Sequence, residues 1–461
     1  MNPKRYNMDM CEGPLAGKIV RYALPLAATY LLQHAFHVAD IIVIGHFGSS
    51  KSLAGIGTTG DLNALMLNLI WGVSVGANVV VAQSYGAKDR KSLIHAVHTS
   101  LALALLFGAT VCALGVTFAP LLLKMINARG EVLAKGTLYW RICLCGAPFM
   151  LIYSYCCAVL RALGDTRRPL IFLSISGVVN VVLNIVFVTV VKLDVAGVAL
   201  ATALSQVLSA AMVLAVMLRS TGPERIMPKH VRFYWPQVKR MLRIGVPAGL
   251  QGMCFSISNV IIMSAINQLE HHATAGNTLA CQLEGAMYVI VIAMYQTAMS
   301  FSGQNYGAHK YRRARRSVLL CAGMLTAVVV TMSSVFLIFG RKLLGVITPD
   351  TVDAEQALER LGWTLPAYFL LGLMDVSTGG LRGIGVSFKP ALATVLGVCG
   401  FRVIWVKTTF PLERFHSLAG LFISYPISWG LVVAINGAMF LIMISRLIKR
   451  GPRASDAAEA A

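Results

Sequence analysis

Twelve long apolar runs constrain this chain more than any other feature of its sequence. A helix that crosses a bilayer needs about 20 mostly apolar residues, and unpaired backbone groups are costly in lipid, so spanning segments are helical or form closed barrels. We therefore predict an all-α integral membrane protein with twelve transmembrane helices. These helices are expected at 17–44, 53–82, 94–118, 136–160, 169–191, 197–218, 244–269, 276–302, 317–340, 362–381, 389–410 and 418–446.

The composition agrees with lipid as the solvent of this chain. Of its 461 residues, 57% are apolar and 13% are charged, whereas soluble proteins carry roughly 25% charged residues. Most of the ten cysteines lie inside apolar runs and lack the spacing of a zinc site. They are expected to be buried free thiols, and the first 15 residues show no cleavable signal pattern.

The net charge of +21 is distributed in a way that predicts orientation. Most of the 40 Lys and Arg residues fall in every second loop, with both termini included. Because basic loops stay on the cytoplasmic side, we expect a multi-pass protein of the plasma (inner) membrane with both termini in the cytoplasm. The partners expected for these loops are anionic lipid headgroups, and nucleic acid is not expected as a partner.

Three motifs of the first half return about 221 residues later in the same order, which indicates a duplication. The pairs are Arg21-Tyr-Ala-Leu-Pro25 with Arg243-Ile-Gly-Val-Pro247, Ala82-Gln-Ser-Tyr-Gly-Ala87 with Gly303-Gln-Asn-Tyr-Gly-Ala308, and Leu160-Arg-Ala-Leu-Gly164 with Leu381-Arg-Gly-Ile-Gly385. An offset of six helices preserves orientation, so two pseudo-symmetric six-helix bundles around a central cavity are expected. Gly86 and Gly307 are predicted to form left-handed helix caps.

The predicted domains follow from this repeat. Residues 1–218 form the N-terminal bundle and 244–446 the C-terminal bundle. The basic, proline-containing segment 219–243 is a cytoplasmic linker, and 447–461 is a cytoplasmic tail.

Four acidic residues lie well within the apolar runs, namely Asp40, Asp61, Glu284 and Asp375. A charged side chain at the bilayer centre costs several kcal/mol and is therefore a functional candidate. The structural alternative is a polar face that packs against another helix. For Asp375, neutralisation by Arg402 or Lys407 is a further alternative.

Asp40 has polar neighbours at helical spacing. Gln33, His37 and Asp40 fall on one face of the first helix, at 100° per residue. Asn180 and Asn184 are one turn apart on the fifth predicted helix, and amide oxygens are ligands for hard cations. We predict a cation-coupling site of Asp40, Asn180, Asn184 and His37, with Na⁺ the one metal ion considered; the amides serve equally well as interhelical contacts.

A second set of residues is predicted to line a substrate cavity. By the repeat offset Glu284 corresponds to Asn63, so both halves place polar groups at the same depth. Apolar and aromatic side chains with a few polar groups are typical of small-molecule sites. The predicted cavity residues are Asp375, Glu284, Asp61, Gln33 and Tyr288.

The chain resembles the multidrug and toxic compound extrusion (MATE) family over nearly its whole length. The resembling motifs are Asp40-Ile-Ile-Val-Ile-Gly-His-Phe-Gly48, Gln83-Ser-Tyr-Gly-Ala87, Leu160-Arg-Ala-Leu-Gly-Asp-Thr-Arg167, Asn180-Val-Val-Leu-Asn184, Gly303-Gln-Asn-Tyr-Gly-Ala308, Asp375-Val-Ser-Thr-Gly-Gly-Leu-Arg-Gly383 and Tyr425-Pro-Ile-Ser-Trp429.

The resemblance implies a fold, an activity and roles for particular residues. The fold would be two six-helix bundles enclosing a cavity, and the activity would be exchange of Na⁺ or H⁺ for organic, often cationic, compounds. Asp40 and Asn180 match the family's N-terminal cation site, and Asp375 matches its acid on the tenth helix. Asn184 stands where many members have a second aspartate, which leaves the identity of the coupling ion open. No cofactor besides that ion is implied, and a monomer is expected.

Two other functions have to be distinguished from this one. A lipid-linked glycan flippase of related fold is the alternative transporter, because Arg402 and Lys407 would suit a substrate with phosphate. An enzyme is not expected, because metalloprotease and P-loop motifs are absent from the sequence. The natural substrate does not follow from the sequence.

Overall fold

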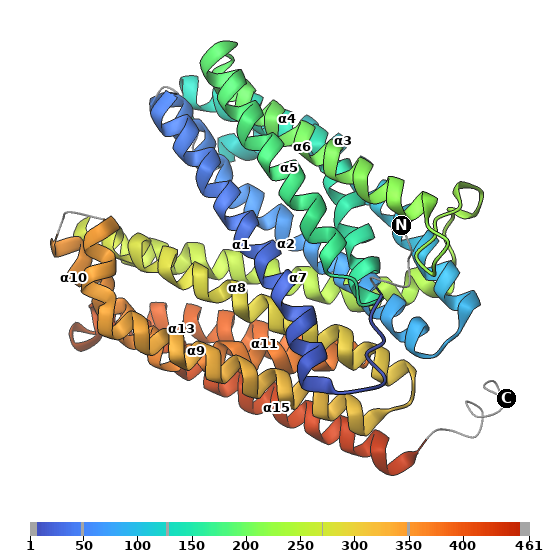
Figure 1. The fold of residues 1–461 in the computed structure, drawn as a ribbon. Coiled ribbons are helices and arrows are strands. Elements are labelled where there is room, and N and C mark those ends of the chain that lie inside the picture. Colours follow the sequence, from blue (N-terminus) through green and yellow to red (C-terminus); the bar gives the residue numbers. More distant parts are fainter. Residues whose placement is uncertain (1–6, 48–49, 126–128, 270, 348–350, 452–461) are drawn as a thin grey trace. The chain divides into compact units, whose positions relative to one another are not determined.

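A computed structural model describes residues 7–47, 50–125, 129–269, 271–347 and 351–451 (Figure 1). All regular structure in these ranges is helical, which confirms the all-α membrane fold. The chain divides into two compact units. Unit 1 contains Met1–Asp9 and Leu24–Gly249, and unit 2 contains Met10–Ala23 and Leu250–Ala461.

The long helices follow the predicted apolar runs. The first half holds α1 (Leu15–Phe47), α2 (Ser50–Gly86), α3 (Arg90–Met125), α4 (Gly130–Ala162), α5 (Arg167–Ile185), the π-helix η2 (Val186–Val190) and α6 (Asp194–Arg219). The second half holds η3 (Pro228–His230), α7 (Trp235–Ile266), α8 (His271–Gly307), α9 (Tyr311–Ile347), α10 (Thr351–Thr364), η4 (Leu365–Ala367) and α11 (Tyr368–Gly383). It ends with α12 (Phe388–Thr394), the π-helix η5 (Val395–Gly400), α13 (Phe401–Thr408), η6 (Glu413–Phe415), α14 (Leu418–Phe422) and α15 (Ser424–Arg450).

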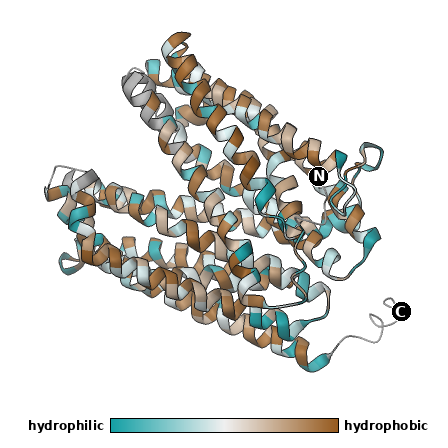
Figure 2. Cartoon of the chain, viewed as in Figure 1, coloured by the Kyte–Doolittle hydropathy of each residue, from teal (hydrophilic) through white to brown (hydrophobic). Residues whose placement is uncertain are grey.

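Within the described ranges, ten helical stretches are long and apolar enough to cross a membrane. Hydrophilic residues gather at the helix ends and in the loops, and apolar residues cover the helix shafts (Figure 2). The predicted runs 17–44 and 362–381 correspond to α1 and to η4 with α11. The sequence predicts no helix at α10, because Asp353, Glu355, Glu359 and Arg360 interrupt its apolar pattern.

The two units share one packing plan. In unit 1, α4 packs against α2, α3 and α6, and α5 packs against α6. In unit 2, α8 packs against α9, α10 and α11, and α11 packs against α9 and α15. The stretch Thr351–Gly383, which holds α10, η4 and α11, thus takes the place that α4 has in unit 1.

The duplication extends to backbone detail. Helices α2 and α8 each have 37 residues and end at the equivalent glycines Gly86 and Gly307. Gly164 and Gly385 both have positive φ, at 92° and 87°, in the turns that end α4 and α11. Repeated motifs therefore build the same local turns in both halves.

The prediction that Gly86 and Gly307 form left-handed caps is wrong. Both are the last residues of their helices, and the left-handed residues are Lys88 and His309, at φ 57° and 56°. Each turn is closed one residue further on, where Asp89 N donates to the carbonyl of Ser84 at 3.2 Å, and the same bond recurs in α8. The helix thus continues through its glycine, and the chain reverses two residues later.

Two helices change unit partway along their length. The first turns of α1 belong to unit 2, and the chain enters unit 1 at Leu24, beside Pro25. In the same way, α7 starts in unit 1 and enters unit 2 at Leu250, three residues after Pro247. An interior proline removes one helical hydrogen bond, which makes these positions the easiest to bend.

The repeated glutamine motif contacts the first turns of α7 in unit 1 and the segment just before α1 in unit 2. In unit 1, the Oε1 atom of Gln83 accepts a hydrogen bond from Arg240 of α7 at 2.9 Å. In unit 2, the equivalent Gln304 accepts a bond from the backbone amide of Met10 at 3.1 Å, and Asn305 donates to the carbonyl of Met10 at 3.2 Å. The motif that marks the duplication therefore makes similar contacts in both halves.

Glycines allow α2 and α7 to cross closely in unit 1. Gly72 and Gly76 of α2 face Gly245 and Gly249 of α7, with three residues between the glycines of each pair. A Cβ atom on Gly72 would lie 2.1 Å from the Cα of Gly249. Small residues at this spacing let helix backbones approach within a membrane.

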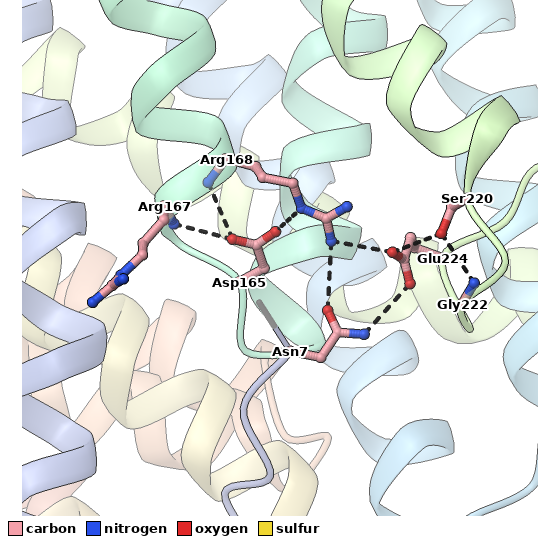
Figure 3. Close-up of polar contacts among 7 residues, drawn as sticks. All are labelled: Asn7, Asp165, Arg167, Arg168, Ser220, Gly222 and Glu224. Atoms are coloured by element: carbon pink, nitrogen blue, oxygen red, sulfur yellow. Dashed lines mark hydrogen bonds and ion pairs between the residues drawn. The ribbon is translucent and has the colours of Figure 1, made fainter. Parts of the chain in front are cut away.

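A buried ion network fastens the loops at one end of unit 1 (Figure 3). Arg168 forms ion pairs with Asp165 and with Glu224, the latter at 3.1 Å, and these three side chains are at most 5% exposed. Asn7 donates to Glu224 at 3.4 Å and accepts from Arg168 at 3.5 Å. Burial raises the pKa of the Asp165 carboxyl, and the Arg168 charge opposes that rise. One guanidinium thus joins the N-terminal segment, the α4–α5 turn and the linker after α6.

Arg168→Gln is expected to destabilise the protein by about 3–5 kcal/mol, because it leaves two carboxylates buried without a counter-charge. The measurement is the thermal unfolding midpoint of the purified protein in detergent. Arg167→Gln is the matched control, since that neighbouring side chain is exposed. Equal midpoints for the two variants would contradict the role given to Arg168.

Gly72→Ala is expected to destabilise unit 1, because overpacking typically costs about 1–3 kcal/mol and the added methyl group meets the backbone of α7. The control is Gly323→Ala in α9, where an added Cβ meets nothing within 4 Å. That change is expected to be neutral or to stabilise by up to about 1 kcal/mol through helix propensity. Thermal unfolding in detergent separates the two; a similar effect of both would refute the close crossing.

Candidate functional site

The structure brings three of the predicted cation-site residues together in unit 1. Asp40 of α1 is half-buried, and Asn180 and Asn184 of α5 are 5% and 0% exposed. The Nδ2 atom of Asn184 donates hydrogen bonds to Asp40 and, at 3.3 Å, to Oδ1 of Asn180. We call Asp40, Asn180 and Asn184 the Asp40 site.

The donor and acceptor balance of the Asp40 site suits a cation. The Oδ1 atom of Asn184 is buried and has no hydrogen-bond partner among the described residues. Its amide nitrogen meanwhile lies next to two oxygens, one from Asp40 and one from Asn180. Turning the amide by 180° would direct a third oxygen to that place, and three oxygens with one negative charge are a fitting ligand set for a hard monovalent cation.

Not all of the predicted residues fall among the described side chains. The side chains of His37 and Asp61 lie outside the part of the chain that the structure describes. Gln33 is half-buried on α1 in unit 1, two turns before Asp40. In the described part of the chain, no group of three His, Cys, Asp or Glu residues could hold a metal ion.

Two residues near Asp40 are absent from the sequence prediction. Tyr139 and Cys143 of α4 interact electrostatically with one another and with Asp40. Tyr139 also packs against the small apolar cluster of Val43, Val188 and Val198. The π-helix η2 begins two residues after Asn184, and π-helical turns occur frequently at functional sites.

Glu284 is held in a buried ion pair in unit 2. Its carboxylate contacts Arg360 of α10, with the two side chains 12% and 6% exposed, and accepts a hydrogen bond from Thr364 at 2.6 Å. Arg360 also donates to Asn277 and, at 3.0 Å, to Cys281. We call these five residues the Arg360 cluster.

The other predicted cavity residues of unit 2 surround Tyr368. Its hydroxyl donates to the carbonyl of Glu284 at 3.1 Å, and Tyr288 and Asp375 lie within its electrostatic reach. Tyr288 is 40% exposed and Asp375 is half-buried. The positive charge that acts on Asp375 is Arg382 of the same helix, in place of Arg402 or Lys407.

Equivalent positions carry polar contacts in both halves. In unit 1, Asn63 accepts a hydrogen bond from the indole of Trp140 in α4 at 2.7 Å. In unit 2, its equivalent Glu284 contacts the stretch equivalent to α4, at Arg360. By the same offset Arg360 corresponds to Tyr139, and Thr364 corresponds to Cys143. The repeat offset is therefore the sequence signal from which these contacts could have been found.

Comparisons with known proteins match this chain over both halves. A family model described as MatE matches residues 25–186 and 247–406. The chain is 24% identical over 415 residues to "Probable multidrug resistance protein YoeA" of Bacillus subtilis (strain 168), covering 88% of this chain and 89% of that protein. It is 23% identical over 441 residues to "Multidrug export protein MepA" of Staphylococcus aureus (strain NCTC 8325 / PS 47), covering 94% and 95%.

A solved structure agrees with the fold. "Crystal structure of MATE in the bent conformation" superposes with a TM-score of 0.89 at 21% identity, covering 96% of this chain and 98% of the other. At this level of identity the similarity establishes the twelve-helix fold.

Glu284→Gln is expected to destabilise the protein by about 3–5 kcal/mol, because it leaves Arg360 buried without its carboxylate. The double replacement Glu284→Leu with Arg360→Met removes both charges and is expected to cost less than the single change. Thermal unfolding in detergent measures both variants. The control is Glu355→Gln in α10, whose pair with Arg341 is exposed, at 3.9 Å, and contributes little. If the double replacement lowered the unfolding midpoint more than Glu284→Gln does, the buried ion pair between Glu284 and Arg360 would be contradicted.

Proposed function

Because this chain belongs to the MatE family of membrane transporters, we propose that it exports organic, cationic or amphipathic small molecules in exchange for Na⁺ or H⁺. Two relatives that are similar over nearly the full length are named for multidrug resistance and multidrug export. The chain is a transporter and not an enzyme. No P-loop motif for ATP, G-x-x-x-x-G-K, is present in the sequence, so an ion gradient is the energy source we propose.

The observation that carries this proposal is the Asp40 site. A carboxylate inside an apolar unit is costly. Asp40 accepts a hydrogen bond there from the neutral amide of Asn184, which also donates to Asn180, and it meets no basic side chain among the described residues. A group that is not neutralised by the protein is free to be neutralised by a visiting cation. The buried, unpartnered oxygen of Asn184 supports Na⁺, whereas the single carboxylate suffices for H⁺.

Coupling would follow from competition for one negative charge. With Asp40 ionised, an organic cation is attracted to unit 1. When Na⁺ or H⁺ neutralises Asp40, that attraction is lost and the cation leaves. An ion that binds one conformation better than the other also shifts the balance between them, which is the requirement for alternating access.

The setting of the transporter is part of the proposal. It would work as a monomer in the plasma (inner) membrane, with both termini in the cytoplasm and its basic loops against lipid headgroups. No cofactor besides the coupling ion is proposed.

A second candidate is a lipid-linked glycan flippase of related fold. The buried guanidinium of Arg402 favours it, because such substrates carry phosphate. Comparing the binding of undecaprenyl pyrophosphate with that of a cationic dye separates the two candidates.

The test is gradient-driven efflux of ethidium from proteoliposomes, with Na⁺ and H⁺ gradients imposed separately. Asp40→Asn is expected to lower the gradient-driven rate by about tenfold or more, because an amide can neither gain a proton nor supply the site's charge. Asp194→Asn is the matched control, since Asp194 is 36% exposed and pairs with Lys135 outside the site. Unaltered gradient-driven efflux in Asp40→Asn would contradict the assignment of Asp40 as the cation-coupling residue.

A further inference from the structure

We infer that Arg402, framed by Tyr425 and Trp429 in unit 2, recognises an acidic group, a carboxylate or a phosphate, on the molecule that this protein transports. The inference rests on the proposed export function and specifies one part of the substrate's chemistry. It assigns to unit 2 a charge preference opposite to that of the Asp40 site.

Arg402 has fewer partners than a buried arginine needs. It is 3% exposed, and its Nε atom donates one long hydrogen bond to Ser428, at 3.3 Å. Its Nη2 atom is buried and has no hydrogen-bond partner among the described residues. Buried donors in folded proteins are nearly always paired, so an unpaired guanidinium nitrogen indicates a ligand to complete it.

The charge of Arg402 is also unbalanced. In the described part of the chain it forms no ion pair with a carboxylate. Glu284 is the acid within its electrostatic reach, and that carboxylate is already paired with Arg360. Two guanidinium groups and one carboxylate leave this part of unit 2 with one excess positive charge. An anion is the ligand that removes the cost of burying it.

The aromatic side chains hold Arg402 in a geometry suited to such a ligand. Its Cζ atom lies 3.6 Å from the ring centroid of Tyr425 and 5.6 Å from that of Trp429. The two rings meet edge to face, at 5.5 Å and 85°. A guanidinium stacked on a ring keeps its N–H donors in its own plane, where they form a fork for a carboxylate or phosphate.

Aromatic residues link this position to the exposed part of unit 2. Trp429 packs edge to face on Tyr368, at 5.8 Å and 80°. Tyr368 in turn lies within electrostatic reach of Tyr288, which is 40% exposed. A flat apolar body beside an acidic group would be accommodated along such a row of rings.

The fold itself does not call for an arginine here. By the repeat offset, Arg402 of α13 corresponds to Val181 of α5, so the first half has an apolar residue at the equivalent position. Arg402 follows the π-helix η5 by two residues, and η5 has no π-helical equivalent at the matching positions of α5. The arginine and a π-helical turn at this position are found in unit 2 and not at the equivalent positions of unit 1, whose own π-helix η2 lies further along the chain. Such a local difference is expected of a feature added for function.

The test is equilibrium binding to the full-length protein in detergent, without any ion gradient. The probes are 4-nitrobenzoate, 4-nitrophenyl phosphate, uncharged methyl 4-nitrobenzoate and cationic 4-nitrobenzylamine. Titration calorimetry gives each Kd, and quenching of tryptophan emission by the nitro group reports proximity to Trp429. The variants are Arg402→Gln, Arg402→Lys and Trp429→Phe. Lys407→Gln is the matched control, because it removes an exposed charge from the same helix.

We expect at least one of the two acids to bind wild-type protein about tenfold more tightly than the ester, and Arg402→Gln to remove that difference, since the charge-assisted fork is lost. Arg402→Lys should recover part of it, and Lys407→Gln should leave it unchanged. Trp429→Phe should reduce the quenching of tryptophan emission and leave the Kd measured by calorimetry unchanged. The acid that gains affinity identifies the group as carboxylate or phosphate.

Two results would overturn the inference. The first is that wild-type protein binds the ester as tightly as both acids. This result requires no variant. The other is an acid preference that persists in Arg402→Gln, or that keeps its full wild-type size in Arg402→Lys if the glutamine variant is not monodisperse. Binding here is measured without a gradient, so the outcome is separate from that for Asp40. If Asp40→Asn abolishes gradient-driven efflux but Arg402→Gln leaves the acid preference unchanged, this inference alone is rejected. If Asp40→Asn leaves gradient-driven efflux unchanged but Arg402→Gln removes the acid preference, the antiport proposal alone is rejected.

Discussion

Placing a charge among apolar helices costs several kcal/mol unless a counter-charge or a full set of hydrogen bonds accompanies it. The buried polar groups of this protein divide according to how that requirement is met. Arg168 and Arg360 have carboxylate partners and serve to fasten segments together. Asp40 has the neutral amide of Asn184, and Arg402 has one hydroxyl and two aromatic rings. Incomplete neutralisation makes these last two residues candidate places for a ligand.

Duplication explains how both kinds of site arose on one scaffold. The two halves repeat helix lengths, left-handed turns and the glutamine that contacts the start of a crossing helix or the segment just before it. Equivalent side chains have nevertheless diverged: Asn63 faces Trp140 in unit 1, and its equivalent Glu284 faces Arg360 in unit 2. Backbone geometry is thus shared, whereas the sign of the buried charge is set separately in each unit.

The sequence predicted the parts of this structure that depend on local pattern. Apolar run length located the long helices, and helical periodicity placed Asn180 and Asn184 on one face, where they meet Asp40. The misses involve long-range pairing. Helix α10 carries too many charges to resemble a spanning helix, and its Arg360 meets an acid 76 residues away in the chain. Nothing in the local sequence marks that pair, although the repeat offset relates it to Asn63.

One consequence of the single carboxylate concerns which ion the transporter would use. With Asn184 in place of a second acid, the Asp40 site carries at most one negative charge, which balances one monovalent cation and not a divalent one. A proton needs only the Asp40 carboxylate, whereas Na⁺ needs further oxygens at its distance. Asn184 can supply such an oxygen only by giving up the hydrogen bond that it donates to Asp40. Na⁺ binding would therefore require the amide to turn, and protonation would not, so the orientation of one side chain separates the two modes of coupling.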